Sequence, residues 1–260
     1  MLKLILSIFF IYKLFKYFYT LFFIKGIYKI NFGEYSIKRI KYLINNKDIE
    51  ELKEIAVNSV GIVPNNPIFK GNNLNNKIVL IIYHKNKPIG FNIMFDYEFE
   101  LNKCLHVGLV LIDKNYQGKK IQEYTKYNGW LYLIENFYRT IYITDVGRSA
   151  SGLKIFNKTI KNSYPNLLYK NTPSDLYKKI FLNFIDKFKD DTQMSPNAFG
   201  NINDFTISNS IDKYGGNYYL LQHGESRKSK DQQYNDLIEK LPQNDDILAV
   251  GKINLFNIFF

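Results

Sequence analysis

One segment of the chain combines residue types that could bind a phosphate group. Residues 104–121, CLHVGLVLIDKNYQGKKI, run from an apolar strand pattern into a basic turn that contains Gly118 and opens a helix. A glycine lets the backbone approach an anion closely, and the N–H groups of residues 117–120 would donate to phosphate oxygens at the positive end of the helix dipole. Lys119 and Lys120 add positive charge. The pattern predicts a phosphate cradle, and the alternative is an ordinary basic turn.

Two side chains near this turn are candidates for a general base. His106 lies on the predicted strand that leads into the cradle, and Asp145 follows the next predicted strand, at residues 140–144. Histidine and carboxylate groups are common proton acceptors in catalysis. Each also has a structural explanation, because a single histidine in a strand is often a hydrogen-bonded core residue, and an aspartate just before Gly147 could form a turn.

The cysteine and histidine content argues against a disulfide framework and a metal centre. Cys104 is the only cysteine, so no disulfide can form within the chain, and an intracellular location is expected. His84, His106 and His223 are far apart in sequence and lack the spacing of zinc ligands. We therefore expect no metal.

Hydrophobic periodicity predicts the elements that position these residues. A hydrophobic content of 46%, with 17% aromatic residues, is enough for a packed core. Apolar residues at helical spacing indicate helices at 46–60, 121–137 and 149–160. Apolar runs bounded by turn residues indicate strands at 78–83, 89–95, 105–112 and 140–144. The predicted order is a helix, three strands, a helix, a strand and a helix.

This order and the cradle together resemble the GNAT superfamily of N-acetyltransferases, over roughly residues 35–169. The family motif Q/R-x-x-G-x-G/A at the head of a helix is similar to NYQGKK, residues 115–120, in which Gly118 matches. The resemblance implies an α+β fold whose mixed, mostly antiparallel central sheet is flanked by helices. It also implies that an amine attacks the thioester of acetyl-CoA or another acyl-CoA directly, without a covalent enzyme intermediate. The residues that it assigns to acyl-CoA binding are Leu111, Ile112, Gln117, Gly118, Lys119 and Lys120.

The chain departs from the family pattern at three positions. Asn115 stands where the family usually has glutamine or arginine, and Lys120 stands where it has glycine or alanine. Phe156 stands in place of a tyrosine that often protonates the departing thiolate in the family, and a phenyl ring has no proton to donate. We predict Tyr164 as the substitute acid, with water as the alternative. The departures leave a second function open, an acyl-CoA-binding or membrane-interaction module without catalysis.

Residues 1–25 form an apolar segment that predicts membrane attachment. The segment is about long enough to span a bilayer, and its inner lysines, Lys13 and Lys16, leave open a helix that lies in the membrane surface. A cleaved signal peptide and a buried helix are further alternatives. Positive charges at the end of the segment and after it, among them Lys25 and Lys29, predict a globular part that faces the cytoplasm.

The net charge of +11 does not by itself indicate a nucleic-acid partner, because the lysines are spread through sequence rich in asparagine and isoleucine. We expect an amine acceptor and membrane lipid as partners instead.

Residues 170–260 are predicted to form a C-terminal α/β extension. A capped helix start is indicated at 172–175, a polar helix at 230–241, and strands at 217–221 and 247–255. The predicted division of the chain is therefore 1–25, 35–169 and 170–260.

Overall fold

The computed structural model describes residues 28–42, 44–61, 69, 74, 76–136, 138–189, 194–210 and 228–253. Within them the strands are β1 (Tyr28–Phe32), β2 (Tyr35–Lys41), β3 (Ile78–His84), β4 (Lys87–Phe99), β5 (Asn102–Ile112), β6 (Ile141–Gly147), β7 (Ser163–Tyr164), β8 (Phe199–Asn201), β9 (Thr206–Ser208) and β10 (Asp246–Ile253). The helices are α2 (Asn46–Val60), the 3-10 turn η2 (Lys114–Tyr116), α3 (Gln122–Glu135), α4 (Ala150–Thr159), α5 (Asp175–Phe188) and α7 (Gln232–Glu239).

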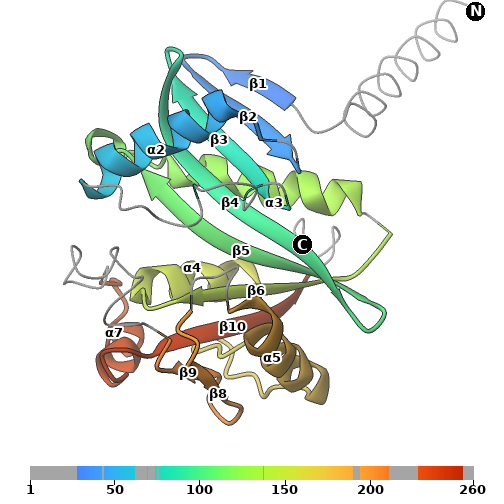
Figure 1. Cartoon of the computed structure of the whole chain (residues 1–260). Helices are drawn as coiled ribbons and strands as arrows, with labels where there is room; N and C mark the ends of the chain where they lie inside the picture. Colours follow the sequence, from blue (N-terminus) through green and yellow to red (C-terminus); the bar gives the residue numbers. More distant parts are fainter. Residues whose placement is uncertain are drawn as a thin grey trace, which may run out of the picture.

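These strands join one sheet with the order β1-β2-β3-β4-β5-β6-β10-β9-β8, and β7 pairs with β10 beside that path (Figure 1). The pair formed by β5 and β6 is parallel, whereas the other pairs are antiparallel. The C-terminal extension therefore contributes β10 to the same sheet, directly beside β6. The predicted mixed, mostly antiparallel sheet is confirmed.

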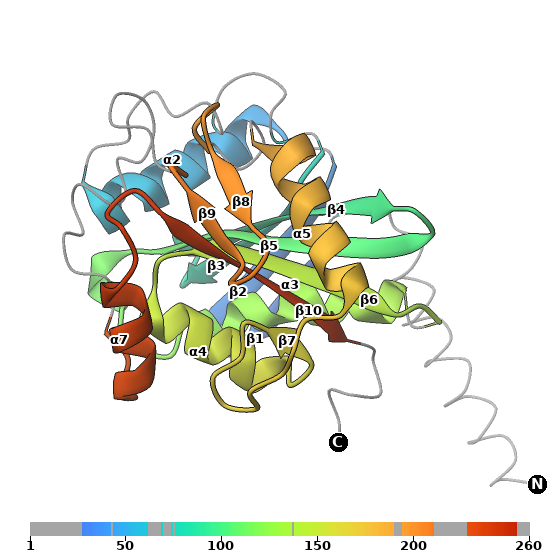
Figure 2. The ribbon, with the colours of Figure 1, turned by 90° about the horizontal axis from the view of Figure 1, so that it is seen from below.

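Helices cover both faces of the sheet. Figure 2 shows α2 and α5 on one face and α3 and α4 on the other. On the first face, Phe184 of α5 packs in one cluster with Phe95 of β4. On the second face, Tyr132 of α3 and Phe156 of α4 pack with Leu105 of β5. The sheet thus has a hydrophobic core on each side, as a central sheet between helices requires.

Side-chain caps determine where three of the helices begin. Asn45, Ser149 and Ser174 each accept a hydrogen bond from the backbone N–H three residues further on, which satisfies one of the free donors at the start of α2, α4 and α5. The capped start predicted at 172–175 is confirmed. The capping residue is Ser174, Pro173 precedes it, and α5 begins at Asp175.

The periodic segments of the sequence correspond to observed elements, with shifted ends. The predicted strands at 89–95 and 105–112 are longer, since β4 and β5 meet in a hairpin at residues 99–102. The hairpin of β1 and β2 was not predicted. Strand β2 reads YSIKRIK, which has no simple apolar alternation, because the charged Arg39 is itself fully buried.

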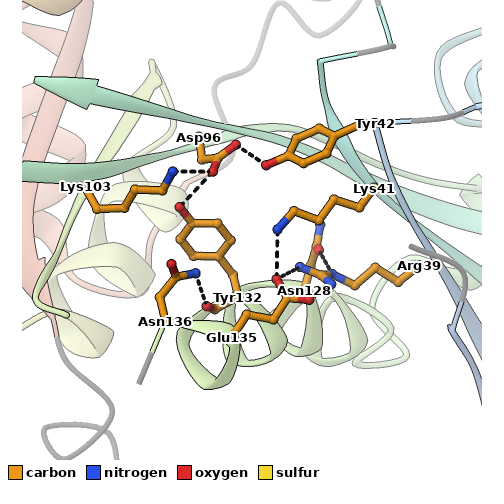
Figure 3. Close-up of polar contacts among 9 residues, drawn as sticks. All are labelled: Arg39, Lys41, Tyr42, Asp96, Lys103, Asn128, Tyr132, Glu135 and Asn136. Carbon is orange, nitrogen blue, oxygen red and sulfur yellow. Dashed lines mark hydrogen bonds and ion pairs between the residues drawn. The ribbon is translucent and has the colours of Figure 1, made fainter. Parts of the chain in front are cut away.

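A buried ion pair explains why Arg39 lies inside the protein. Its guanidinium group donates to both carboxylate oxygens of Glu135 on α3, at 2.5 and 3.2 Å, and to Asn128 on the same helix at 2.9 Å. Lys41 donates to Glu135 as well, at 3.2 Å. Figure 3 shows these side chains between β2 and α3. The pair holds α3 against the N-terminal strands.

A second polar contact anchors the same C-terminal half of α3. The carboxylate of Asp96 on β4 accepts hydrogen bonds from Tyr42, Tyr132 and Lys103, at 2.7, 3.1 and 2.9 Å (Figure 3). Burial disfavours the charged form of Asp96, yet these hydrogen bonds outweigh it and lower the pKa of the carboxyl below its usual value. The helix that follows the cradle is therefore tied to β2, β4 and β5.

Several sequence predictions lie outside the described residues. They are the membrane segment at 1–25, the strand at 217–221 and the environment of His223. Among the helices that the structure does describe, none has the length and apolar character needed to cross a bilayer.

Candidate functional site

Strands β5 and β6 lie side by side over only part of their length. Their parallel register joins residues 103–107 of β5 to residues 141–145 of β6. Beyond this point β5 continues along β4, and β6 continues along β10. In the described part of the chain, one edge of β5 from Gly108 to Ile112 therefore has no strand partner. Backbone N–H and C=O groups on this edge are available to a bound molecule.

A β-bulge marks the point of divergence. Met94 pairs with Val107 and Asn92 pairs with Val110, so that Gly108 and Leu109 together lie opposite Ile93. A Cβ atom at position 108 would lie 2.6 Å from the carbonyl oxygen of Ile93, which explains the glycine. A bulge of this kind bends the strand locally.

The predicted cradle follows directly at the end of β5. Asp113 caps η2 by accepting from the N–H of Asn115 at 2.9 Å, and the side-chain amide of Gln117 donates to the carbonyl of Ile112 at 3.0 Å. Gly118 has a φ of +77° and Lys120 a φ of +60°, which turn the chain into α3. The left-handed conformation at Gly118 explains why glycine stands there.

The backbone donors of this turn are available to an anion. Within the described residues, the N–H groups of Gly118 and Lys120 donate to no backbone carbonyl, and no side chain caps α3 at Ile121. The side chain of Lys120 is exposed, as is that of Lys119. A Cβ atom added to Gly118 would have no atom within 4 Å, so the space in front of the glycine is open. The predicted cradle residues thus lie together at one helix start, where an anion is favoured.

Asp145 lies at the last paired position before the strands diverge. It is opposite Val107 of β5 and Ala249 of β10, so its side chain shares their face of the sheet, the face of α3 and α4. No described residue forms a hydrogen bond or ion pair with its carboxyl group, and burial raises its pKa to about 7. A carboxyl with this pKa exchanges protons readily near neutral pH.

His106 lies on the opposite face. Its Nδ1 atom is 3.2 Å from the hydroxyl of Thr144, and its ring packs between Phe95 and Phe184. Burial, together with the nearby charge of Lys77, lowers the pKa of His106 to about 3, so the imidazole is neutral at physiological pH. Of the two predicted bases, the pKa values favour Asp145, because a base with a pKa as low as that of His106 accepts protons poorly near pH 7.

Neither of the two positions discussed for the general acid offers a free acidic group at the divergence. Phe156 is buried in the core between α4 and the sheet. Tyr164 lies on β7, across β10 from β6, and its hydroxyl group donates to the carbonyl of Asn203 at 3.0 Å. The remaining predicted contacts, Leu111 and Ile112, are buried side chains on the free-edged part of β5.

A depression of about 420 Å³ lies elsewhere, where β4 extends beyond the end of β3. It is lined by Tyr42, Asn76, Lys77, Phe95, Asp96, Tyr97, Glu98, Lys103 and Phe188. Lys103 is already paired there with Asp96 and Glu98.

Comparisons with known proteins find only weak similarity to solved structures. No protein-family model and no curated protein sequence matches the chain. A GNAT family acetyltransferase from Elizabethkingia anophelis with acetyl-CoA bound is 12% identical, covers 85% of this chain and 100% of its own, and has a TM-score of 0.39. An aminoglycoside acetyltransferase from an uncultured soil metagenomic sample is 16% identical, with 42% and 76% of the chains covered and a TM-score of 0.33. The ribosomal-protein-S18-alanine N-acetyltransferase from Escherichia coli is 11% identical, with 42% and 66% covered and a TM-score of 0.31.

The order of the described elements agrees with the predicted resemblance. A helix, three antiparallel strands, a helix, a strand parallel to the third and a further helix follow one another, and the parallel strands splay apart. The described chain thus has the mixed, mostly antiparallel sheet flanked by helices that the sequence predicts.

Two features of this fold were not predicted from the sequence. The bulge could have been recognised from Gly108, because a glycine inside an apolar strand run often marks one. His84 was read as an isolated histidine, whereas it contacts Tyr116 beside the cradle, at 3.0 Å from the hydroxyl oxygen to Nδ1. No local pattern could have revealed this contact, since the two residues lie on separate elements.

Proposed function

We propose that the chain is an acyl-CoA-dependent N-acyltransferase that transfers an acetyl group to an amine. The observation that carries the proposal is the divergence of β5 from β6, with a carboxyl group at its apex and an anion cradle at the end of β5. An activated acyl group and an acceptor must meet in such a site with a base close by.

The residues of the cradle fit the pyrophosphate of an acyl-CoA. The open space at Gly118 and the donors around it suit an anion, and the exposed Lys119 and Lys120 add charge. The co-substrate supplies the thioester, whose acyl carbon the amine attacks. Backbone donors on the free edge of β5, between Gly108 and Ile112, would hold the acyl-CoA and stabilise the negative charge that develops on the carbonyl oxygen.

Asp145 is the base in this proposal. Its carboxylate would take the proton of the acceptor ammonium group, because amines attack only when deprotonated. The pKa of about 7 lets the carboxyl hold this proton and release it again. The thiolate would be protonated by solvent, since the hydroxyl of Tyr164 is bound to Asn203 and Phe156 has no acidic proton.

The first experiment measures binding and turnover separately on the full chain in a mild detergent. Acetyl-CoA at a hundredfold excess over its Kd should stabilise the chain by about 2.7 kcal/mol, visible as a higher melting temperature. Release of free thiol in the presence of a panel of amines then reports transfer. The proposal would be contradicted if neither acetyl-CoA nor any longer acyl-CoA raised the melting temperature or gave thiol release.

The alternative is an acyl-CoA-binding module without catalysis. Phe156 favours it, because the residue cannot serve as the acid. Stabilisation by acyl-CoA without thiol release for any amine would support this alternative.

Replacing Gly118 with alanine tests the cradle. The positive φ makes the variant less stable by roughly 1 kcal/mol, and the new methyl group enters the space in front of the backbone donors. We expect its Kd for acetyl-CoA, measured by calorimetry, to rise by roughly tenfold or more, equivalent to about 1.4 kcal/mol. Gly61→Ala is the control, because Gly61 has a φ of +98° at the end of α2 and should lose stability without losing affinity. Equal affinities in the two variants would argue against the cradle.

Replacing His106 with glutamine tests the other predicted base. We expect the pH dependence of kcat to stay unchanged, because His106 is neutral throughout the physiological range. Lost packing against Phe95 and Phe184 should lower the free energy of unfolding by about 1 to 2 kcal/mol. Loss of the ionisation near pH 7 from the rate profile would instead identify His106 as the base.

Membrane attachment through residues 1–25 is a separate proposal that rests on the sequence, with the globular part facing the cytoplasm. Flotation of the full chain with anionic lipid vesicles, compared with a chain that starts at residue 26, tests it. Equal flotation of the two chains would contradict it.

A further inference from the structure

Three polar side chains from separate turns meet beside the cradle. Glu34 lies in the turn between β1 and β2, His84 ends β3, and Tyr116 belongs to η2. The Nδ1 atom of His84 is 3.0 Å from the hydroxyl oxygen of Tyr116, and its Nε2 atom is 3.2 Å from a carboxylate oxygen of Glu34. The imidazole thus bridges the N-terminal hairpin and the loop that precedes Gly118.

The direction of these hydrogen bonds follows from the carboxylate. Hydrogen bonds from Lys85 and His84 lower the pKa of Glu34, so this group accepts. The proton of a neutral His84 therefore resides on Nε2, and Nδ1 accepts from the hydroxyl group of Tyr116. The hydrogen bond between Nε2 and the carboxylate thus determines that Nδ1 is a hydrogen-bond acceptor.

Ring packing holds the same arrangement. The imidazole lies 4.9 Å from the ring of Tyr35 and 5.4 Å from the ring of Tyr116, measured between centroids. The side chain of His84 is 21% exposed, so most of it is enclosed by its neighbours. A single orientation of the imidazole is thus favoured by stacking as well as by its two hydrogen bonds.

Tyr116 connects this arrangement to the donors of the cradle. Its carbonyl accepts from the N–H of Lys119 at 3.3 Å, and the ammonium group of Lys119 lies 5.2 Å from the centre of its ring. Gly118 is two residues away in the chain. A shift of the Tyr116 side chain would therefore move the backbone that presents the free N–H groups.

We propose that Glu34, His84 and Tyr116 form a clamp that positions the phosphate cradle for the acyl-CoA, with His84 as the positioning residue. The inference rests on the proposed function, because it assigns a role in binding the same co-substrate. A loop held in its binding conformation loses less freedom when the ligand binds, so the clamp raises affinity without touching the reacting atoms.

The test uses His84→Phe and Tyr116→Phe in the full chain. Phenylalanine preserves the stacking at position 84 but removes both hydrogen bonds, and at position 116 it removes only the hydroxyl group. Each variant should raise the Kd of acetyl-CoA by roughly tenfold, as the loss of one ordering hydrogen bond allows, while kcat at saturation stays unchanged. The double variant should bind no more weakly than His84→Phe alone, because His84→Phe already removes the hydrogen bond to Tyr116. Tyr169→Phe is the control, since Tyr169 is an exposed tyrosine in the loop after α4 and should keep the wild-type Kd.

A second measurement separates this inference from the proposed function. Amide hydrogen exchange at residues 114–121, without ligand, should be faster in His84→Phe and Tyr116→Phe than in the wild type and in Tyr169→Phe. If the wild type binds acyl-CoA and His84→Phe binds equally well, the clamp is wrong although the proposed function stands. If the wild type binds no acyl-CoA, the proposed function fails, and unchanged exchange in both variants would overturn the clamp as well.

Discussion

Replacing Asp145 with asparagine should lower kcat by roughly 10² to 10³-fold and at the same time stabilise the folded chain at pH 8. The first effect follows if the carboxylate is the base, because an amide accepts no proton in this range. The second follows from burial, which raises the pKa of Asp145 from 3.8 to about 7. The charged carboxylate is therefore less stable in the folded chain than in the unfolded one.

The burial of Asp145 also predicts how turnover and stability depend on pH. Turnover by the wild type should rise with pH through about 7, as Asp145 loses its proton. Stability should fall as pH rises from about 4 to about 7, because the unfolded chain ionises at the lower value and the folded chain only at the higher one. Partial exposure of the carboxyl reduces the effect, so we expect a loss of about 2 kcal/mol, absent in Asp145→Asn.

Asp186→Asn is the matched control for these measurements. Asp186 is exposed on α5, and its replacement should change neither kcat nor the pH dependence of urea unfolding. An Asp145→Asn variant with full turnover would remove Asp145 from the mechanism. A variant that is less stable than the wild type at pH 8 would show that the carboxylate is favourably solvated in the fold.

Replacing Glu135 with glutamine should lower the free energy of unfolding by about 3 kcal/mol. The substitution keeps the size of the side chain but removes the charge that balances Arg39, whose side chain is fully buried. At the size of this chain, such a loss lowers the melting temperature by roughly 10 °C. Urea unfolding followed by the fluorescence of Trp130, the only tryptophan and a residue of α3, measures it.

Two further variants show whether the charge pair is responsible. Arg39→Met combined with Glu135→Leu should be more stable than Glu135→Gln alone, because no buried charge is left without its counter-ion. Lys41→Ala should change stability by less than about 1 kcal/mol, since Lys41 is partly exposed at the same carboxylate. If the free energy of unfolding of Glu135→Gln lies within about 1 kcal/mol of the wild-type value, the other contacts of Arg39 are enough to stabilise its buried charge.

The sequence predicted those parts of the fold whose hydrophobic pattern is local. Helices α2 and α5 have apolar faces and capping residues that can be read from neighbouring positions. Strand β2 could not be recognised this way, because the burial of Arg39 depends on Glu135, which lies 96 residues later in the chain. Tertiary pairing overrode the polar character of that segment.

The same distinction between local and long-range contacts applies to the candidate site. The cradle was predictable, since Gly118 and its flanking lysines are adjacent in sequence. The two candidate bases could not be ranked, because the faces on which His106 and Asp145 lie depend on strand register. The clamp at His84 joins residues 34, 84 and 116, which only the folded sheet brings together.

The position of β10 has a consequence for how the chain is made. Strand β6, which carries Asp145, pairs with β10 over seven positions, and β10 is among the last described segments of the sequence. On the ribosome, β6 and the helices around it emerge about a hundred residues before this partner, with an unprotected apolar edge. Folding of the nascent chain therefore cannot be completed before β10 has been synthesised. Until then, aggregation competes with folding.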